Sequence, residues 1–104
     1  MKKRLYISIP ITGVEDKSRI KAEQLQKHFE AQGYEVINPF EIGIHIEELH
    51  KLCGMIHPTW HNYMDWCLKA ICFADIIYFC KGWEKSEGCK LEMQVSKNKE
   101  IRYE

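Results

Sequence analysis

The sequence predicts an α/β fold, a three-layer sandwich in which helices cover both faces of a parallel sheet of four or five strands. Two observations predict it. Strand-like and helical patterns alternate along the 104 residues, and the segment 76–80 (IIYFC) is a continuous apolar run of the kind found in strands covered on both faces. This length suits a single domain over residues 1–104.

The first half of the chain has the pattern strand, helix, strand. Residues 5–9 (LYISI) are rich in β-forming side chains. Residues 15–32 carry apolar side chains at spacings of three and four, and Gly33 supplies a helix stop. Residues 34–38 (YEVIN) predict a second strand. This order predicts a right-handed parallel crossover.

The second half is expected to contain two helices and two strands. The helices are predicted over residues 60–73 and 87–98, and the strands over 76–80 and 101–103. Residues 40–58 have weak helical spacing that two glycines and a proline interrupt, so we expect a mobile, irregular excursion. Ligands of such folds bind where the loops gather at the carboxyl ends of the strands.

Charge balance limits the kind of partner. Fifteen basic residues offset fifteen acidic ones. The chain therefore lacks the positive field expected of a protein that binds a nucleic-acid polymer or an anionic membrane surface. An anionic small molecule would have to be held by local geometry.

The start of the chain and its cysteines favour a cytoplasmic protein. The opening MKKRLYISIPITG has too few apolar residues for a signal peptide or a membrane span. The five cysteines are odd in number and include no C-x-x-C pair, which argues against a disulfide framework or a zinc ribbon. We expect reduced thiols, most of them buried.

A cluster of polar residues, GWEKSEGCKLEM, lies where a strand hands over to the last helix. Glu92 follows Ser86 by six residues and Gly88 by four, which places its carboxylate about one turn into that helix. Ser86 can cap the helix, and Gly88 lets the backbone approach a ligand closely. We expect the helix dipole to keep Glu92 ionised, which suits a nucleophile; the alternative is an acid that only complements the helix start.

The turn after the first strand is the second candidate site. Pro10, Thr12 and Gly13 belong to a tight turn whose N–H groups and hydroxyl can bind a phosphate or a sugar hydroxyl. The alternative is an ordinary strand exit with Thr12 as a helix cap. Trp60, Tyr63 and Trp83 offer planar faces for a base, or core and interface packing instead.

Two further chemistries receive less support. The histidines and a cysteine between positions 45 and 61 have none of the usual zinc spacings, so we expect no metal; they are His45, His50, Cys53, His57 and His61. Cys89 at a helix start is a candidate nucleophile, but no histidine lies near it in sequence, and an inert thiol is the alternative.

Four segments carry a family resemblance: YISIPITG, GYEVINP, TW-x-x-YM and ADIIYFCKGWEKSEGCKLE. Together they resemble the DUF4406 group of small proteins, which is similar to a branch of the nucleoside 2-deoxyribosyltransferase superfamily that includes the deoxynucleoside monophosphate N-glycosidases. The resemblance runs from Leu5 to about Val95. It implies a flavodoxin-like, nucleoside deoxyribosyltransferase-like fold and an active site completed by a neighbouring subunit, hence a homo-oligomer.

The resemblance also assigns roles. Glu92 matches the catalytic glutamate that attacks the anomeric carbon of the deoxyribosyl group. Positions matching the loops that line the sugar, base and 5′-phosphate pocket are Tyr6, Ser8, Pro10, Ser86 and Gly88. This chain departs from the pattern in having Ile9 where relatives often have glycine, and Cys67 where they have an aspartate. Asp65, on a different helix face, is the remaining candidate for that second catalytic role.

The expected function is cleavage or transfer of an N-glycosidic bond in deoxynucleosides or their 5′-monophosphates. The reaction would parallel a retaining glycosidase and would need no cofactor. One alternative is a non-catalytic nucleotide-binding or sensing module that keeps the same pocket. Another is a cysteine-containing oligomerisation protein with no small ligand.

Overall fold

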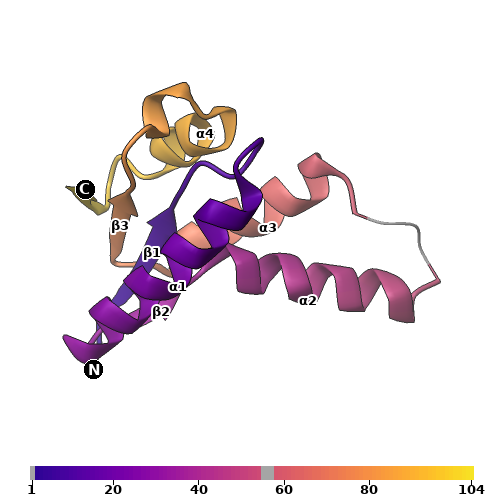
Figure 1. Cartoon of the computed structure of the whole chain (residues 1–104), viewed down its shortest axis with the longest axis horizontal. Coiled ribbons are helices and arrows are strands. Elements are labelled where there is room, and N and C mark those ends of the chain that lie inside the picture. Colours follow the sequence, from indigo (N-terminus) through magenta and orange to yellow (C-terminus); the bar gives the residue numbers. More distant parts are fainter. Residues whose placement is uncertain (1, 55–57) are drawn as a thin grey trace.

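A four-stranded parallel sheet forms the centre of the computed structural model, which describes residues 2–54 and 58–104. The strands are β1 (Arg4–Ser8), β2 (Glu35–Ile37), β3 (Ile76–Phe79) and β4 (Glu100–Tyr103). Their spatial order is β2-β1-β3-β4, and all three pairings are parallel (Figure 1). The predicted sheet is therefore confirmed, with four strands.

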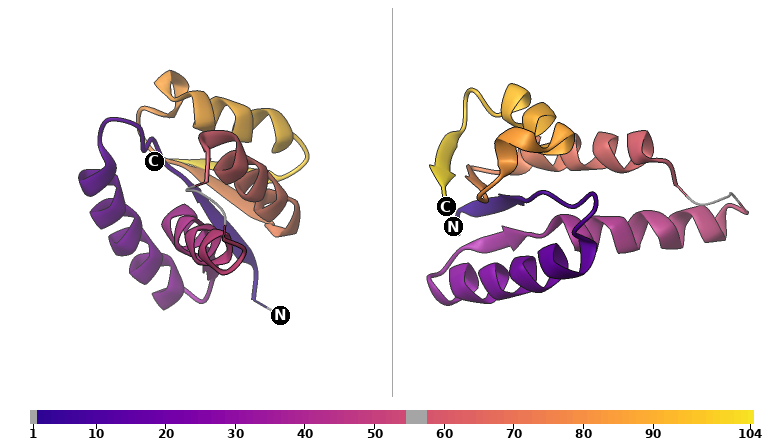
Figure 2. Two further views of the ribbon diagram at one scale, coloured as in Figure 1. Left: turned by 90° about the vertical axis from the view of Figure 1, so that its right-hand side faces the viewer. Right: turned by 45° about the horizontal axis from the view of Figure 1, so that its top comes forward.

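Helices cover both faces of this sheet. Helix α1 (Glu15–Ala31) lies on one face, and α3 (Trp60–Phe73) and α4 (Glu87–Val95) lie on the other, which gives the three predicted layers (Figure 2). The chain thus has a flavodoxin-like α/β architecture. Helix α4 ends three residues earlier than the predicted 87–98, because the chain turns there toward β4.

Side-chain alternation along β1 decides which residues face the site. Leu5 and Ile7 point into the core under α1, while Tyr6 points into the core under α3, together with Cys67. Because successive strand side chains alternate between faces, Ser8 lies on the same face as Tyr6. Both side chains are fully buried, and both bond to Glu92 of α4.

The prediction of an irregular excursion over 40–58 is wrong for most of that segment, because residues Pro39–Leu52 form helix α2. The side chain of Asn38 caps this helix by accepting a hydrogen bond from the Phe40 N–H (2.9 Å), and Pro39 occupies its first turn. Gly43 does not interrupt the helix, and it packs beside α3, where a Cβ would lie at an ordinary contact distance of 3.5 Å from the Tyr63 ring. Residues 55–57 lie outside the described part.

Helices α2 and α3 run side by side and extend beyond the sheet as an arm (Figure 2). Helix α2 begins directly after β2, at the carboxyl edge of the sheet, and α3 leads back to the start of β3. None of the helices in residues 2–54 and 58–104 combines the length and the apolar character that crossing a bilayer requires.

We expect Asn38→Ala to lower the free energy of unfolding by about 1–2 kcal/mol, because it removes the cap of α2. It also removes the hydrogen bond from Asn38 Nδ2 to Gln26 Oε1 (3.0 Å), which ties α2 to α1. Urea denaturation measures the change. Asn98→Ala, at an exposed turn, is the matched control and should stay within about 0.5 kcal/mol of the parent. Equal stability of the two variants would contradict this role for Asn38.

Candidate active site

The strand order places a crevice between the carboxyl ends of β1 and β3. The chain runs from β1 outward to β2 and later returns to the other side of β1 as β3. Such a reversal leaves a gap between the loops that follow the two central strands, and ligands of open α/β sheets bind there. The loop 9–13 and the segment 80–88 border this crevice.

Glu92 lies beside the crevice and is almost completely buried, with 5% of its surface exposed. Its Oε1 accepts a hydrogen bond from Ser8 Oγ (2.8 Å), and its Oε2 accepts one from the Tyr6 hydroxyl. The two donors come from β1 and the acceptor from α4, 84 and 86 residues away in sequence. The structure therefore brings three of the predicted site residues, Tyr6, Ser8 and Glu92, into direct hydrogen bonding.

Burial, rather than the helix dipole, decides the protonation state of Glu92. Removal from water raises its pKa to about 7, although the hydrogen bonds from Tyr6 and Ser8 lower it in part. Glu92 is the sixth residue of α4, beyond the first turn where the dipole acts. The expectation of a fully ionised carboxylate is therefore wrong at neutral pH. A pKa near neutrality makes both the ionised and the protonated form available for chemistry.

Asp65 does not belong to this site. It lies on the exposed side of α3, whereas Cys67 on the buried side lies next to the Tyr6 hydroxyl. The structure therefore does not bring Asp65 to Glu92, because two residues along a helix point about 200° apart. Cys67 occupies the place that faces Tyr6 and Glu92.

Two hollows lead toward Glu92. An outer cleft of about 590 Å³ is lined by Pro10, Ile11, Thr12, Trp60, Gly82, Lys85, Ser86, Glu87 and Gly88. A narrow inner pocket of about 30 Å³ shares Thr12, Trp60 and Ser86 with it and reaches Glu92 and Met64. A space of that size holds one or two water molecules and not a sugar. A ligand in the cleft thus lies next to the pocket of Glu92, and a sugar reaches the carboxyl only if the inner pocket widens.

The wall between the hollows is built by the start of α4. Ser86 caps this helix, as predicted, and its Oγ accepts a hydrogen bond from the Cys89 N–H (3.3 Å). Gly88 borders both hollows, and a Cβ at this position would lie only 3.3 Å from Met64 Sδ. Met64 is an unbranched side chain that can change rotamer at low cost. A change of its rotamer would alter the width of the inner pocket that it lines.

The turn after β1 contributes one wall of the cleft. Pro10 and Thr12 line it, whereas Gly13 lies behind the turn at φ 84° and donates its N–H to Glu15 Oε1 (3.1 Å). The alternative of Thr12 as a helix cap is wrong, because the N-cap of α1 is Val14, which makes no side-chain hydrogen bond. The Thr12 side chain borders both hollows.

The aromatic residues divide between the site and the core. Trp83, predicted to bind substrate, packs instead against Phe79 (5.1 Å between ring centroids) and Tyr103 (6.0 Å) and borders neither hollow. Trp60 borders both hollows and Tyr63 the inner one. The sequence signal for Trp60 was its position directly after Thr59, which caps α3 at the rim of the crevice.

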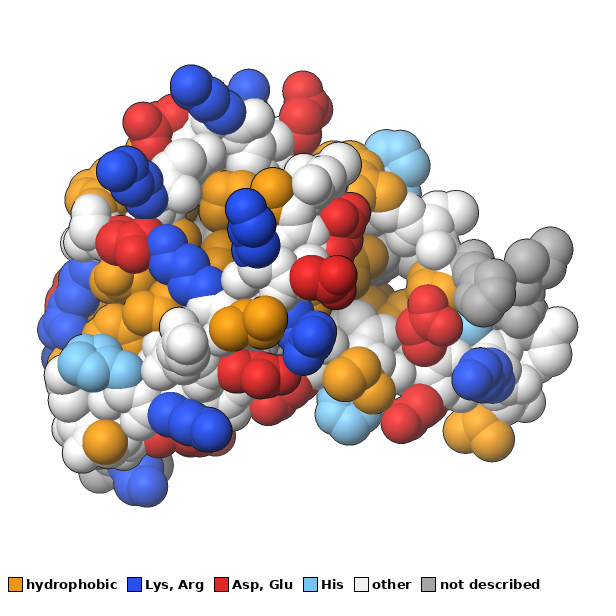
Figure 3. Space-filling model, viewed as in Figure 1, with side chains coloured by type: hydrophobic (Ala, Val, Ile, Leu, Met, Phe, Trp, Pro, Cys, Tyr) orange, Lys and Arg blue, Asp and Glu red, His pale blue; other side chains and the backbone are white. Residues whose placement is uncertain are grey.

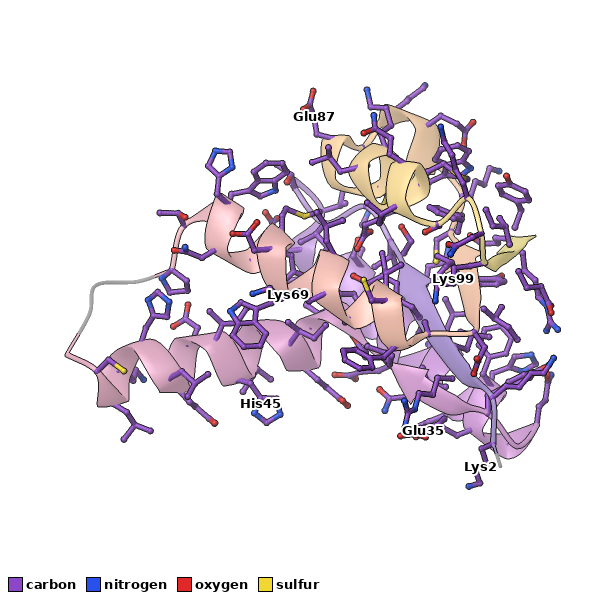
Figure 4. The ribbon with its side chains drawn as sticks, turned by 180° about the vertical axis from the view of Figure 1, so that it is seen from behind. Lys2, Glu35, His45, Lys69, Glu87 and Lys99 are labelled. Carbon is purple, nitrogen blue, oxygen red and sulfur yellow. The ribbon has the colours of Figure 1, made fainter. Side chains whose placement is uncertain are left out.

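Neither a metal nor a reactive thiol is indicated. In the described residues, no three His, Cys, Asp or Glu side chains are arranged to hold an ion. His45 points away from α3 (Figure 4), and His57 lies outside the described residues. Burial raises the pKa of Cys89, so its thiolate is not favoured. Three of the five cysteines are buried, as expected, and all are free.

Comparison with known proteins gives one match. A family model described as "Domain of unknown function (DUF4406)" covers residues 3–103. Neither the curated proteins nor the solved structures contain a match to this chain.

Proposed function

Since the chain belongs to the DUF4406 family, whose function is unknown, we propose a function from its site: it cleaves or transfers the N-glycosidic bond of deoxynucleosides or their 5′-monophosphates, with Glu92 as nucleophile. One observation carries this proposal. The buried carboxyl of Glu92 is held by Tyr6 and Ser8 at the bottom of a pocket, at the edge of the sheet where α/β folds bind ligands.

The proposed mechanism needs only this chain and water. The ionised form of Glu92 attacks the anomeric carbon as the bond to the base breaks, and the base leaves with the bonding electron pair. Water, or a second base, then displaces the carboxylate from the sugar, and the proton that it gives up balances the one that the departed base takes from solvent. The hydroxyls of Tyr6 and Ser8 hold one carboxylate oxygen each and so fix its orientation.

The cleft suits a nucleotide-sized molecule. Its volume of about 590 Å³ falls within the range of small-molecule sites, and its lining combines the Trp60 ring, the side chains of Thr12 and Ser86, and Lys85. On the face seen in Figure 3, basic and acidic side chains are interspersed and form no patch of one sign. This distribution and the zero net charge favour a small ligand over a nucleic-acid polymer.

Release of free base is the direct test. The protein is incubated with each deoxynucleoside and each deoxynucleoside 5′-monophosphate, with and without a second free base as acceptor, and the products are separated by chromatography. Free base without an acceptor indicates a hydrolase, and a new nucleoside with one indicates a transferase. No product from any of these substrates would overturn the proposal.

A specific observation favours the second candidate, a nucleotide-sensing module without catalysis. Both carboxyl oxygens of Glu92 already have hydrogen-bond donors, and the inner pocket of about 30 Å³ does not admit a sugar unless it widens. This candidate predicts saturable nucleotide binding with no release of base. An oligomerisation protein without a ligand predicts no thermal shift with any nucleotide.

We expect Trp60→Ala to weaken nucleotide binding about tenfold, because a base that stacks on the indole loses that contact. Calorimetric titration measures the affinity. Trp66→Ala is a matched control, since Trp66 lies on the same helix with similar exposure (47% against 42%) and borders neither hollow. Equal affinities for the two variants would show that the base lies elsewhere.

Self-association belongs to the same proposal. Large apolar side chains are exposed on α2 and α3: Ile44, Leu49, Leu52, Trp60, Trp66 and Phe73. Covering such surface with a second copy would lower the free energy of the assembly. Sedimentation velocity over a concentration series tests this, and a monomer at all concentrations would contradict it.

A further inference from the structure

A third hollow, with a basic lining, lies next to the outer cleft, and Pro10 borders both spaces. Its volume is about 150 Å³, and it is lined by Ile9, Pro10, Val14, Lys17, Ser18, Lys21 and Lys81. Three of these seven residues are lysines and none is acidic, although the chain as a whole has no net charge. The hollow is therefore a local concentration of positive charge.

The three lysines come from two segments of the chain. Lys17 and Lys21 lie four residues apart on α1, which places them on the same face of that helix. Lys81 belongs to the segment that follows β3. No ion pair joins the ammonium group of Lys17 or Lys81 to an acidic side chain of the described residues. These two charges are therefore available to a ligand.

The chain already binds one carboxylate oxygen at this cluster. Glu104 Oε1 accepts hydrogen bonds from Lys21 Nζ and from the Lys81 N–H (2.7 Å). The Glu104 N–H in turn donates to the Phe79 carbonyl oxygen (2.9 Å), which fixes its backbone to β3. The hydrogen bonds from Lys21 and Lys81 hold the pKa of Glu104 below its ordinary value, so the group is ionised at neutral pH. Two donors at the hollow are thus arranged to hold an oxyanion.

The size and the donors of the hollow fit a phosphate ion. Both donors bond to the same oxygen of Glu104, so a carboxylate uses only one of its two oxygens here. A phosphate can offer one oxygen in the same way, and its other oxygens remain free to accept from the ammonium groups of Lys17 and Lys81. A space of about 150 Å³ can hold benzene, so an ion of five heavy atoms fits as well.

We propose that this hollow is a binding site for inorganic phosphate, and that the phosphate exchanges with the Glu104 carboxylate. One phosphate oxygen takes the place of Glu104 Oε1 at Lys21 and Lys81, and Lys17 contacts the others. Glu104 is then an internal ligand that competes with phosphate. Neither Glu92 nor the inner pocket takes part, so the inference does not rest on the proposed function.

Titration with sodium phosphate, followed by proton–nitrogen correlation NMR, tests this site. The resonance of the Lys81 N–H should move and then saturate, because its acceptor changes from a carboxylate to a phosphate oxygen. Sodium chloride at the same ionic strength is the control for screening of charges. A response to phosphate that does not saturate, or that chloride reproduces, would overturn the proposal.

Variants of the lysines test whether the hollow itself binds the ion. Lys17→Gln should weaken phosphate binding about two- to fivefold, the effect of losing one exposed charged contact. Lys81→Gln keeps the backbone N–H at that position and should weaken binding to a similar degree. Lys27→Gln is the matched control, since it removes the same charge from an exposed position of α1 that does not line the hollow. Equal weakening by Lys17→Gln and Lys27→Gln would indicate attraction to overall charge and overturn the proposal.

Glu104→Gln tests the exchange. This variant removes the competing anion, so the affinity for phosphate should rise about two- to fivefold. Glu23→Gln is its control: it makes the same change in charge and releases Arg19 from an ion pair (3.3 Å), but Glu23 does not line the hollow. A rise in Glu104→Gln alone would support the proposal. Unchanged or weaker binding, or an equal rise in both variants, would overturn it. The remaining resonances show that each variant is folded.

Discussion

Glu92→Gln should reduce release of base from a deoxynucleoside monophosphate by about a thousandfold or more, with little change in binding of the intact nucleotide. The variant keeps the shape of the side chain and removes its ability to form a bond to the anomeric carbon. Binding is preserved because Glu92 borders the inner pocket and is not among the residues that line the outer cleft. Single-turnover rates and calorimetric affinities measure the two effects separately.

Glu84→Gln is the control for this substitution. Glu84 is an exposed glutamate on the short helix η1 (Trp83–Lys85) and borders neither hollow, so its loss should leave the rate unchanged. A Glu92→Gln protein that releases base at the parent rate would remove Glu92 as the nucleophile. An inactive parent that still binds nucleotides would favour the sensing module.

The parts of the fold that depend on local pattern could be predicted from the sequence. The strand at 76–79 is an unbroken apolar run, and the helix at 15–31 shows its period and its glycine stop, so chain order alone predicted the parallel sheet. Helix register placed Glu92 near the Ser86–Gly88 loop, and the family resemblance assigned Tyr6 and Ser8 to the same pocket, where the structure shows them bonded to Glu92. These features are short-range or shared by a family.

Helix α2 was not predicted because the dipeptide Asn38-Pro39 that precedes it has two interpretations. Asn-Pro after a strand is typical of a turn, but it is also the cap and first position of a helix. Here Asn38 caps α2 and Pro39 begins it. Gly43 looked like a breaker, yet it lies inside α2 at ordinary contact distance from the Tyr63 ring of α3. Contacts between distant segments decided this element, and a local pattern does not contain them.

The electrostatics of the site were also beyond the sequence. Glu92 was expected to be ionised because it lies near a helix start, but the pKa depends on how completely β1, α3 and α4 exclude water from it. Trp83 was expected at the pocket because of its charged neighbours, and it packs instead on Phe79, which belongs to β3. Both outcomes are properties of tertiary packing.

Glu92 should also make the stability of the protein depend on pH. Its pKa is about 7 in the folded chain and 4.5 as the ordinary value, so between these pH values the folded state binds more protons than the unfolded state. The free energy of unfolding therefore falls as pH rises through this window. The stability that the protonated acid contributes is fully present below the pKa of the unfolded chain, and it is lost as pH rises above the pKa of the folded chain. The difference between the two pKa values corresponds to a change of about 3 kcal/mol in the free energy of unfolding.

Glu92→Gln removes this titration, because an amide is neutral at both ends of the window. The gain in stability of the variant over the parent should be about 3 kcal/mol larger at about pH 8 than at about pH 4.5, as measured by urea denaturation at each pH. Contributions of other titrating groups are common to both proteins and cancel in this comparison, as does any fixed difference in hydrogen bonding between amide and acid. A gain that is the same at both pH values would mean that Glu92 has an ordinary pKa in the folded chain. The hydrogen bonds from Tyr6 and Ser8 would then offset burial in full, and Glu92 would be ionised at neutral pH.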